Sequence, residues 1–368
     1  MRMKTIALLL PFVLSACAAG GGNRAIPSSA NPPLGSVRPM ADDKTSVLKL
    51  LTKQLVIGST VDPSNGDTHP LGITISKAKY GKLAKGAMLV CNYSDKNGKA
   101  GAGSTIVTFS NPVPGATAAR YAQSSSLLGC ASMTIDAGGN AWASAWAAKS
   151  ETSVSTAKKV NHTIKSPLVR PWNNIFGTTG GLYPTTAVFT GDASTGKIVR
   201  VDPVYLTATP VITGFAVKNG TLGPTALQYD ASIDTLYIAD GANNTVVAVQ
   251  HAMNLFKAKS IVVQPGGTTF SGTDASWASV VKVGSPLNGV IGSTLLPNHN
   301  LIFSNTLDAA GKNLLVEMTP HGKVLATRNV DPGAAGALGG LYSTGTTDAT
   351  TQVFFTDANA NNVQVLEQ

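Results

Sequence analysis

Acidic residues are scarce in this chain of 368 residues, which has 19 Asp and Glu together against 28 Lys and Arg. Only three acids are Glu, namely Glu151, Glu317 and Glu367. Charged residues are 13% of the chain, about half the usual share. This composition argues against a helical bundle rich in Glu and Lys. Since hard divalent cations usually need carboxylate oxygens, we also predict no metal, and we predict no other cofactor.

Motifs of enzyme chemistry are also missing. The sequence has no Gly-x-Ser-x-Gly elbow, no His-Glu-x-x-His pair, and no glycine-rich loop followed by Lys-Ser or Lys-Thr. Its five His are scattered. The sequence therefore specifies no reaction, and whether the protein is an enzyme stays open at this point.

The apolar segment 6–16 is too short to span a bilayer, which takes about 20 residues. It follows Arg2 and Lys4 and ends in Leu-Ser-Ala before Cys17, an order typical of an export signal. This ending resembles the lipobox of bacterial lipoproteins. The resemblance implies that residues 1–16 are a signal peptide and that Cys17 becomes lipidated. The alternative is an ordinary secretory signal with Cys17 as a bystander.

The lipoprotein resemblance implies a place in a bacterial cell envelope. Ala18, rather than an acid, follows Cys17, which resembles sorting to the outer membrane, with the protein facing the periplasm. Residues 17–43 are rich in Ala, Gly, Ser, Asn and Pro and have few large apolar residues, so we expect a flexible tether. The lipid would make the membrane a partner of the protein.

Cleavage of the signal lowers the formal charge from +9 to +7, because Arg2 and Lys4 are lost. Much of the remaining charge comes from six lysines in one short region: Lys77, Lys79, Lys82, Lys85, Lys96 and Lys99. Such a patch can bind nucleic acid or anionic lipid. We favour a solvated edge and predict no nucleic-acid partner, because the aromatic residues among these lysines do not follow a stacking pattern and an exported protein rarely meets nucleic acid.

One strand–turn–strand pattern recurs beyond the tether. In its clearest copy, residues 227–230, 235–240 and 245–249 are short apolar strands separated by turn residues. Asp240 stands six positions before the first apolar residue of the next strand, and Asp192 and Asp357 keep the same interval. We interpret these Asp residues as structural, since Asp side chains accept hydrogen bonds from turn backbone.

The copies recur with a period typical of a β-propeller. Their turn residues lie near positions 92, 145, 192, 240, 305 and 357, with steps of about 50 and one longer step. We therefore predict an all-β, six-bladed β-propeller over residues 44–368. Five or seven blades and a two-sheet sandwich are the alternatives. Because the last copy has only three strands, an N-terminal strand at 47–51 or 54–58 should complete it and close the ring.

The repeats resemble a known family. Tyr229-Asp230, residues 236–240 and Asn243-Asn244 resemble the NHL repeat, and residues 57–72 are similar to the start of uncharacterised bacterial NHL-type propellers. Those proteins are exported and of unknown activity. The resemblance implies the fold of residues 45–368 and leaves function open, because propellers host many functions.

The residues just before each inner strand should gather at one mouth of the central channel. They are His69-Pro70, Gly129-Cys130, Pro171-Trp172, Gly223-Pro224, Pro286 with Asn288, and Gly336–Gly339. From these we select His69, Trp172 and Asn288 as candidate ligand-binding residues, without assigning a catalytic one. A lone His in such a place is more often structural than a base or ligand.

Two further features could bear on function. Trp277 lies in the long step between the fourth and fifth copies, where it could form a flap over the mouth, although we favour packing beside its own blade. Cys91 ends the second strand of the first blade, and Cys130 precedes the first strand of the second blade. Both should lie on one face, so they form either a disulfide or two buried thiols.

The sequence favours a binding or protein-interaction module whose partner is an envelope protein or a glycan. The alternative is an exported lactonase-like hydrolase or a sugar oxidoreductase acting at the channel mouth. Six-bladed lactonase-like enzymes place acids and amides there to hold a divalent cation. This chain departs from that pattern, because no carboxylate precedes an inner strand.

Overall fold

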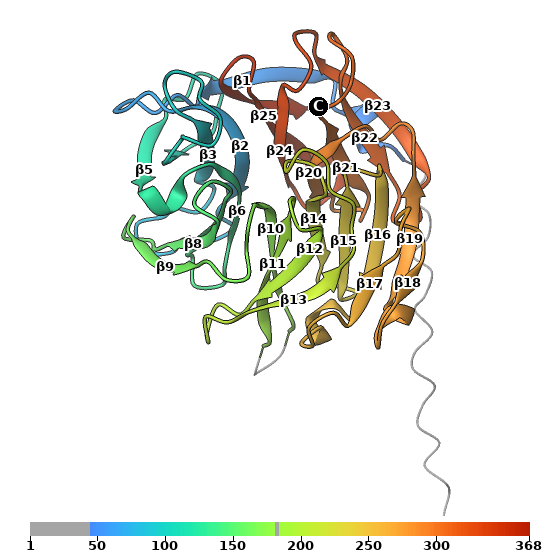
Figure 1. The fold of residues 1–368 in the computed structure, drawn as a ribbon. Helices are drawn as coiled ribbons and strands as arrows, with labels where there is room; N and C mark the ends of the chain where they lie inside the picture. Colours follow the sequence, from blue (N-terminus) through green and yellow to red (C-terminus); the bar gives the residue numbers. More distant parts are fainter. Residues whose placement is uncertain (1–44, 181–183) are drawn as a thin grey trace, which may run out of the picture. The chain divides into compact units, whose positions relative to one another are not determined.

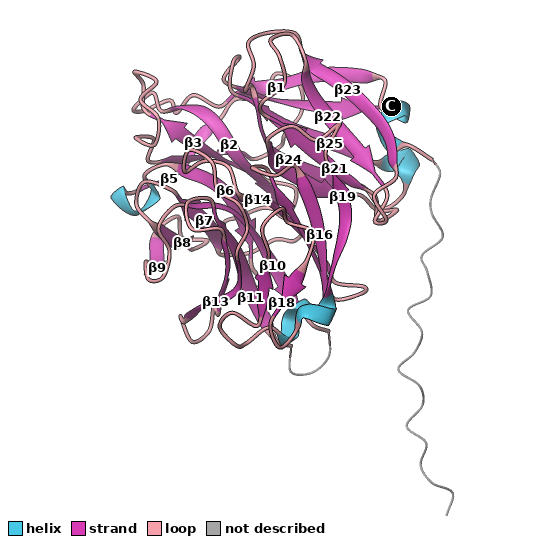
Figure 2. Ribbon diagram, turned by 45° about the vertical axis from the view of Figure 1, so that its right-hand side comes forward, coloured by secondary structure: helices cyan, strands magenta, loops and turns pink. Residues whose placement is uncertain are grey.

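The computed structural model describes residues 45–180 and 184–368. The predicted signal peptide, the predicted tether and Cys17 lie outside the described residues. Six sheets surround a central channel and form a six-bladed β-propeller, which confirms the predicted fold and blade number (Figure 1). Helices are short and lie at the edges (Figure 2). In the described ranges, no helix is long and apolar enough to cross a membrane.

Each blade begins with its inner strand and continues outward. Blades 1 to 3 contain β2 (Thr68–Ile75), β3 (Met88–Ser94), β4 (Thr105–Phe109) and β5 (Ala119–Gln123); β6 (Cys130–Ile135), β7 (Ala141–Ala145), β8 (Ser150–Val154) and β9 (Val160–Ile164); and β10 (Pro171–Thr178), β11 (Thr186–Asp192), β12 (Lys197–Val201), β13 (Ala208–Thr213), β17 (Ile261–Val263) and β18 (Phe270–Ser271).

Blades 4 to 6 contain β14 (Pro224–Asp230), β15 (Thr235–Asp240), β16 (Thr245–Gln250) and β19 (Ala278–Val283); β20 (Val290–Leu295), β21 (Leu301–Asn305), β22 (Asn313–Met318) and β23 (Val324–Asp331); and β24 (Leu338–Thr344), β25 (Gln352–Asp357), β26 (Asn362–Glu367) and β1 (Lys53–Ser59). The helical turns are α1 (Val47–Leu50), η1 (Ser125–Leu127), η2 (Ala252–Asn254), η3 (Ala275–Trp277) and η4 (Asp348–Thr350).

The hydrophobic core lies between neighbouring blades. One cluster joins blade 1 to blade 2 through Leu89, Ile106 and Met133, and another joins blade 4 to blade 5 through Tyr237 and Phe303. Strands buried on both faces explain why the repeats read as continuous apolar runs rather than as strict alternation.

The N-terminal segment closes the ring, as predicted. β1 pairs antiparallel with β26, so the first strand lies beside the last in Figure 1. Of the two candidate segments, the one at 54–58 forms this strand. The other, at 47–51, contains α1 instead, because the Glu317 carboxylate accepts the N–H groups of Val47 and Leu48 at the start of this turn. Ser46 also caps the turn by accepting a hydrogen bond from the Lys49 N–H.

The turn aspartates have the predicted structural role. Oδ1 of Asp240 accepts hydrogen bonds from the N–H groups of Ala242 and Asn243, at 2.9 and 3.2 Å, and Oδ2 accepts from Ala216. Asp192 has an equivalent place in blade 3, where it also accepts from Val169. Each carboxylate thus fixes its own turn and the loop that leads into the inner strand of the same blade.

The long step between the fourth and fifth copies contains three strands, β17, β18 and β19. After β16, the chain leaves blade 4 and adds β17 and β18 to the outer edge of blade 3, where β13 pairs parallel with β17. It then returns as β19, the outer strand of blade 4. Ile261 and Val263 are buried in the cluster shared by the two blades, which explains the extra length.

Candidate functional site

Two cavities lie along the channel. The first, of about 310 Å³, occurs where the inner strands begin and is lined by His69, Tyr93, Trp172, Leu222 and Leu307, among others. We refer to it as the aromatic mouth. The second, of about 450 Å³, is lined by residues of all six inner strands and extends to the loops where those strands end. We refer to it as the polar channel.

A shared irregularity of the inner strands separates the two cavities. Each inner strand has a β-bulge near its start, directly after the first paired residue in five strands and after the second, Pro70, in β2. Four residues at these bulges pack in one apolar cluster, the collar: Leu71, Ala131, Trp172 and Ile291. Trp172 lines the aromatic mouth, whereas the next residue, Asn173, lines the polar channel. The bulges therefore divide the channel into two compartments.

Glycines let the inner strands approach one another at this level. A Cβ on Gly72 would collide with the backbone of Ser132 in blade 2, and one on Gly292 would collide with the carbonyl oxygen of Gly339 in blade 6. The backbones thus touch directly, which keeps the ring narrow at the collar.

His69 lies in the aromatic mouth in an unusual backbone conformation. Its φ is 62°, a left-handed value that costs a residue with a Cβ roughly 1 kcal/mol. The His69 N–H donates to Oδ1 of Asn361 in blade 6, at 2.8 Å, which holds the conformation. Burial lowers the pKa of the imidazole, so the ring is neutral at neutral pH. Among the described residues, no carboxylate orients the ring.

Aromatic rings surround His69. The centroid of the Tyr93 ring lies 5.9 Å from that of His69, 5.8 Å from that of Trp172 and 5.9 Å from that of Trp146. Burial raises the pKa of Tyr93 to about 12, so its phenol stays protonated. The Arg170 guanidinium covers Trp146, with Cζ 3.8 Å from the ring centroid. The mouth therefore presents rings and an uncharged imidazole rather than an acid–base pair.

The structure brings His69 and Trp172 together but places the other two candidates elsewhere. Asn288 does not line the cavity, and its amide donates to the carbonyl oxygen of Leu307 at 2.8 Å. Trp277 lies in η3, packs against the core shared by blades 3 and 4, and contacts the ring of His251 at 5.4 Å. Trp277 therefore packs beside its own blade, as we favoured, and does not form a flap over the mouth.

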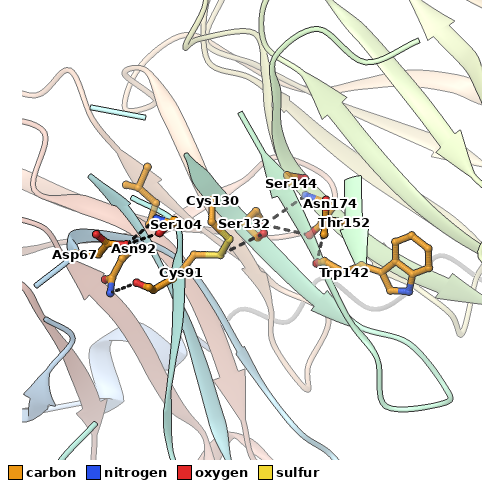
Figure 3. The surroundings of a disulfide bond; sticks show 12 residues. Asp67, Cys91, Asn92, Ser104, Cys130, Ser132, Trp142, Ser144, Thr152 and Asn174 are labelled. Atoms are coloured by element: carbon orange, nitrogen blue, oxygen red, sulfur yellow. Dashed lines mark hydrogen bonds between the residues drawn. A yellow bond between two sulfur atoms is a disulfide. The ribbon is translucent and has the colours of Figure 1, made fainter. Parts of the chain in front are cut away.

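The two remaining cysteines meet between blades 1 and 2. Cys91 and Cys130 are fully buried, their Cα atoms lie 5.4 Å apart, and a disulfide joins them (Figure 3). This separation is within the range that a disulfide requires. The bond links β3 of blade 1 to the inner strand of blade 2, close to Ser132 at the edge of the polar channel.

Tyr93 and Leu307 contribute to the aromatic mouth but were missed from the sequence. Tyr93 lies near the end of a second strand, and second strands end on the face where inner strands begin. The sequence argument that placed Cys91 on this face, at the end of a second strand, would also have placed Tyr93 there. Leu307 lies in a loop after such a strand, and no sequence pattern marks it.

A buried carboxyl adjoins the polar channel. Glu151 is fully buried and accepts hydrogen bonds from Ser144 in its own blade, at 2.9 Å, and from Asn174 and Thr190 in blade 3. Burial raises the pKa of Glu151 to about 7, against the opposite effect of these hydrogen bonds. Asn174 also lines the polar channel, and Figure 3 shows it between Ser132 and Trp142. The sequence did not point to this network, because its partners come from distant strands.

Across 45–180 and 184–368, no three His, Cys, Asp or Glu side chains gather in a group that could hold a metal ion. Asp136 lines the polar channel, but its carboxylate accepts hydrogen bonds from Asn140 and from the Trp142 indole within its own hairpin. The geometry therefore supports binding by rings, amides and hydroxyls.

No protein-family model matches the chain, and no curated protein matches it in sequence. Solved structures do match in fold. A gluconolactonase from Xanthomonas campestris has a TM-score of 0.56 at 10% identity, over 86% of this chain and 89% of its own. Virginiamycin B lyase from Staphylococcus aureus has a TM-score of 0.50 at 17% identity, over 86% and 85%. A chain of a nidogen/laminin complex has a TM-score of 0.51 at 13% identity, over 75% and 85%. At these identities, the similarity shows the six-bladed propeller fold.

Proposed function

We propose that this protein is a binding module, held at a bacterial envelope by a lipid on Cys17, whose aromatic mouth receives an apolar side chain of an envelope protein. The observation that carries the proposal is the grouping of His69, Tyr93 and Trp172 in one cavity without a charged partner for the imidazole. Buried aromatic pockets of this kind are typical anchoring points in protein interfaces.

The rim of the mouth supports a protein partner. Leu307 is 44% exposed and lines the cavity. Val217, on the loop before β14 that also supplies Leu222, is 48% exposed. Covering such residues on binding removes apolar surface from water, which favours association.

Site-specific photo-crosslinking in cells tests the proposed partner site. A photoreactive residue at position 307 should give a defined adduct with an envelope protein, and Leu307→Glu should weaken capture of that protein by the purified chain. Position 204 provides the matched control, because Val204 is 71% exposed in a loop between β12 and β13 and lines neither cavity. Equal adducts from both positions, or none from 307, would contradict the proposal.

The anchor is tested separately. Cys17→Ser should move the protein from the membrane fraction to the soluble fraction, because the hydrophobic anchor is lost. Retention of the variant in the membrane fraction would overturn lipidation as the means of attachment, without bearing on the aromatic mouth.

A second candidate function is a hydrolase of lactones that acts at the same mouth. One observation favours it, the neutral imidazole of His69 held in a left-handed backbone conformation within a cavity. The absence of an orienting carboxylate in the described residues counts against it. Hydrolysis of δ-gluconolactone that disappears in His69→Ala would favour the enzyme, whereas no hydrolysis by the wild-type protein would favour the binding module.

A further inference from the structure

We propose that the polar channel is a second, separate binding site, which takes a neutral, hydroxyl-rich ligand the size of a mono- or disaccharide. This inference goes beyond the function proposed for the aromatic mouth and does not depend on it. The cavity has a volume of about 450 Å³, within the range of small-molecule sites.

Polar atoms without a partner in the described chain converge on this cavity from three blades. Thr74 of blade 1 makes no side-chain hydrogen bond. Asn173 of blade 3 uses its Oδ1 to accept from the Leu227 N–H at 3.2 Å, which leaves both amide protons of Nδ2. Gln228 of blade 4 donates from Nε2 to the carbonyl oxygen of Ser293 at 2.8 Å, which leaves its Oε1. The cavity thus offers a hydroxyl, a donor and an acceptor.

This mixture fits hydroxyl groups, which donate and accept at once. The remaining polar side chains of the wall are largely occupied by one another. For example, Ser343 donates to the carbonyl oxygen of Leu295 at 2.6 Å, and Thr294 donates to Ser343 at 3.0 Å. These bonds hold the wall in place, so the three unpartnered groups are presented by a rigid frame rather than by loops.

Rings and charges narrow the ligand class further. Tyr80, Phe176, Tyr229 and Tyr342 also line the cavity and provide apolar surface for the flat faces of a sugar ring. Lys77 and Asp136 are the charged residues of the lining. The Asp136 carboxylate is engaged in its own hairpin, and Lys77 is exposed to solvent. The site therefore offers no free carboxylate for a cation and only one solvated ammonium for an anion, which favours a neutral ligand.

The collar separates this site from the aromatic mouth. Leu71, Trp172 and Ile291 line the mouth, while Ile73, Asn173 and Ser293, one or two residues further on, line the polar channel. The polar channel reaches the loops at the ends of the inner strands, as the presence of Lys77 and Ala231 in its lining shows. A ligand would enter from the face opposite the aromatic mouth.

Calorimetric titration of the full-length protein tests the proposal with N,N′-diacetylchitobiose, a neutral disaccharide with hydroxyl and amide groups. The anionic and cationic comparison probes are digalacturonate and unacetylated chitobiose. We expect saturable binding of the neutral probe at millimolar concentration and weaker or no binding of the other two. No saturable heat with the neutral probe, or tighter binding of a charged one, would overturn the proposal.

Matched variants locate the binding. Thr74→Val keeps the shape of the side chain and removes a hydroxyl without an intramolecular partner, so it should weaken binding about three- to tenfold while the thermal midpoint stays close to wild type. Asn173→Asp keeps the acceptor for Leu227 and removes the donor, so it should weaken binding at least as much. Thr221→Val makes the same change in the aromatic mouth and should leave the affinity unaltered. Wild-type affinity in both Thr74→Val and Asn173→Asp, or a loss of affinity in Thr221→Val, would overturn the assignment to the polar channel.

Discussion

The ring is held together in different ways on its two sides. Between blades 1 and 3, the links are a disulfide and the side-chain network of Glu151, all within the propeller repeats. Between blades 5 and 6, the link is the N-terminal segment, which docks on blade 5 through Glu317 and then completes blade 6 as β1. Two of the three glutamates in the chain are thus fully buried at blade junctions.

The surroundings of the two glutamates differ in one respect. Glu317 accepts two backbone N–H groups, of Val47 and Leu48 at 3.0 and 2.8 Å, and the hydroxyl of Ser46 at 2.7 Å. Glu151 accepts hydrogen bonds from side chains. Backbone donors cannot rotate away when their acceptor is lost, whereas hydroxyls and amides can. The comparison indicates that loss of the carboxylate costs more stability at Glu317, whose backbone donors stay in place, than at Glu151.

The largest effect should follow from Glu317→Ala. The substitution removes the acceptor of four buried donors, including the Asn300 amide, so the free energy of unfolding should fall by about 5 kcal/mol. Urea denaturation measures this loss, and faster proteolysis near α1 should accompany it. Glu367→Ala is the control, because Glu367 is partly exposed and accepts only from Gln352, and it should cost less than about 0.5 kcal/mol. Equal losses in the two variants would remove the special role of Glu317.

A smaller effect is expected when the disulfide is removed. The bond closes a loop with a sequence separation of 39, so the double variant Cys91→Ala, Cys130→Ala should lose about 3 to 4 kcal/mol of unfolding free energy. Wild-type protein unfolded in the presence of a reductant should lose a similar amount, whereas the double variant should not respond to the reductant. A response of the double variant, or none of the wild type, would show that the two cysteines are not paired.

The smallest effect depends on pH. Burial raises the pKa of Glu151 from 4.5 to about 7, so the folded state holds the proton more tightly than the unfolded chain. The contribution of this group to stability is therefore complete below pH 4.5 and falls by about 3 kcal/mol as the pH rises through 7. Glu151→Gln keeps a group of the same shape without the titration, so its stability should vary less between pH 5 and 7.5. If the stability of wild type and variant changed in parallel with pH, Glu151 would be excluded as the source of the pH dependence.

The sequence predicted the features that repeat and missed those that do not. The blade number came from six copies with turn residues about 50 positions apart, and Asp192, Asp240 and Asp357 share one interval because the same kind of turn recurs in three of these copies. The closing strand was predicted as one of two segments, since both are apolar. What distinguishes them is Glu317, about 270 positions away, and no local pattern records such a partner.

The candidate site was predictable in part for the same reason. His69 lies just before the bulge of β2, and Trp172 lies at the bulge of β10. Their positions at the start of inner strands were therefore enough to predict that they lie at one mouth. Asn288 occupies an equivalent position, but its amide is held by the carbonyl oxygen of Leu307, a local interaction that residue type does not reveal. The polar channel was not predicted, because nothing in the sequence distinguishes Thr74, Asn173 and Gln228 from other strand residues. They come together only when the six inner strands form the closed ring.

The detour of the chain through blade 3 has a consequence for how this propeller can be divided. Blade 4 acquires its outer strand, β19, only after β17 and β18 have joined the edge of blade 3. The two blades therefore cannot be exchanged singly between related propellers or deleted one at a time. For recombination, whether natural or in the laboratory, these two blades form one unit, the continuous segment from β10 to β19.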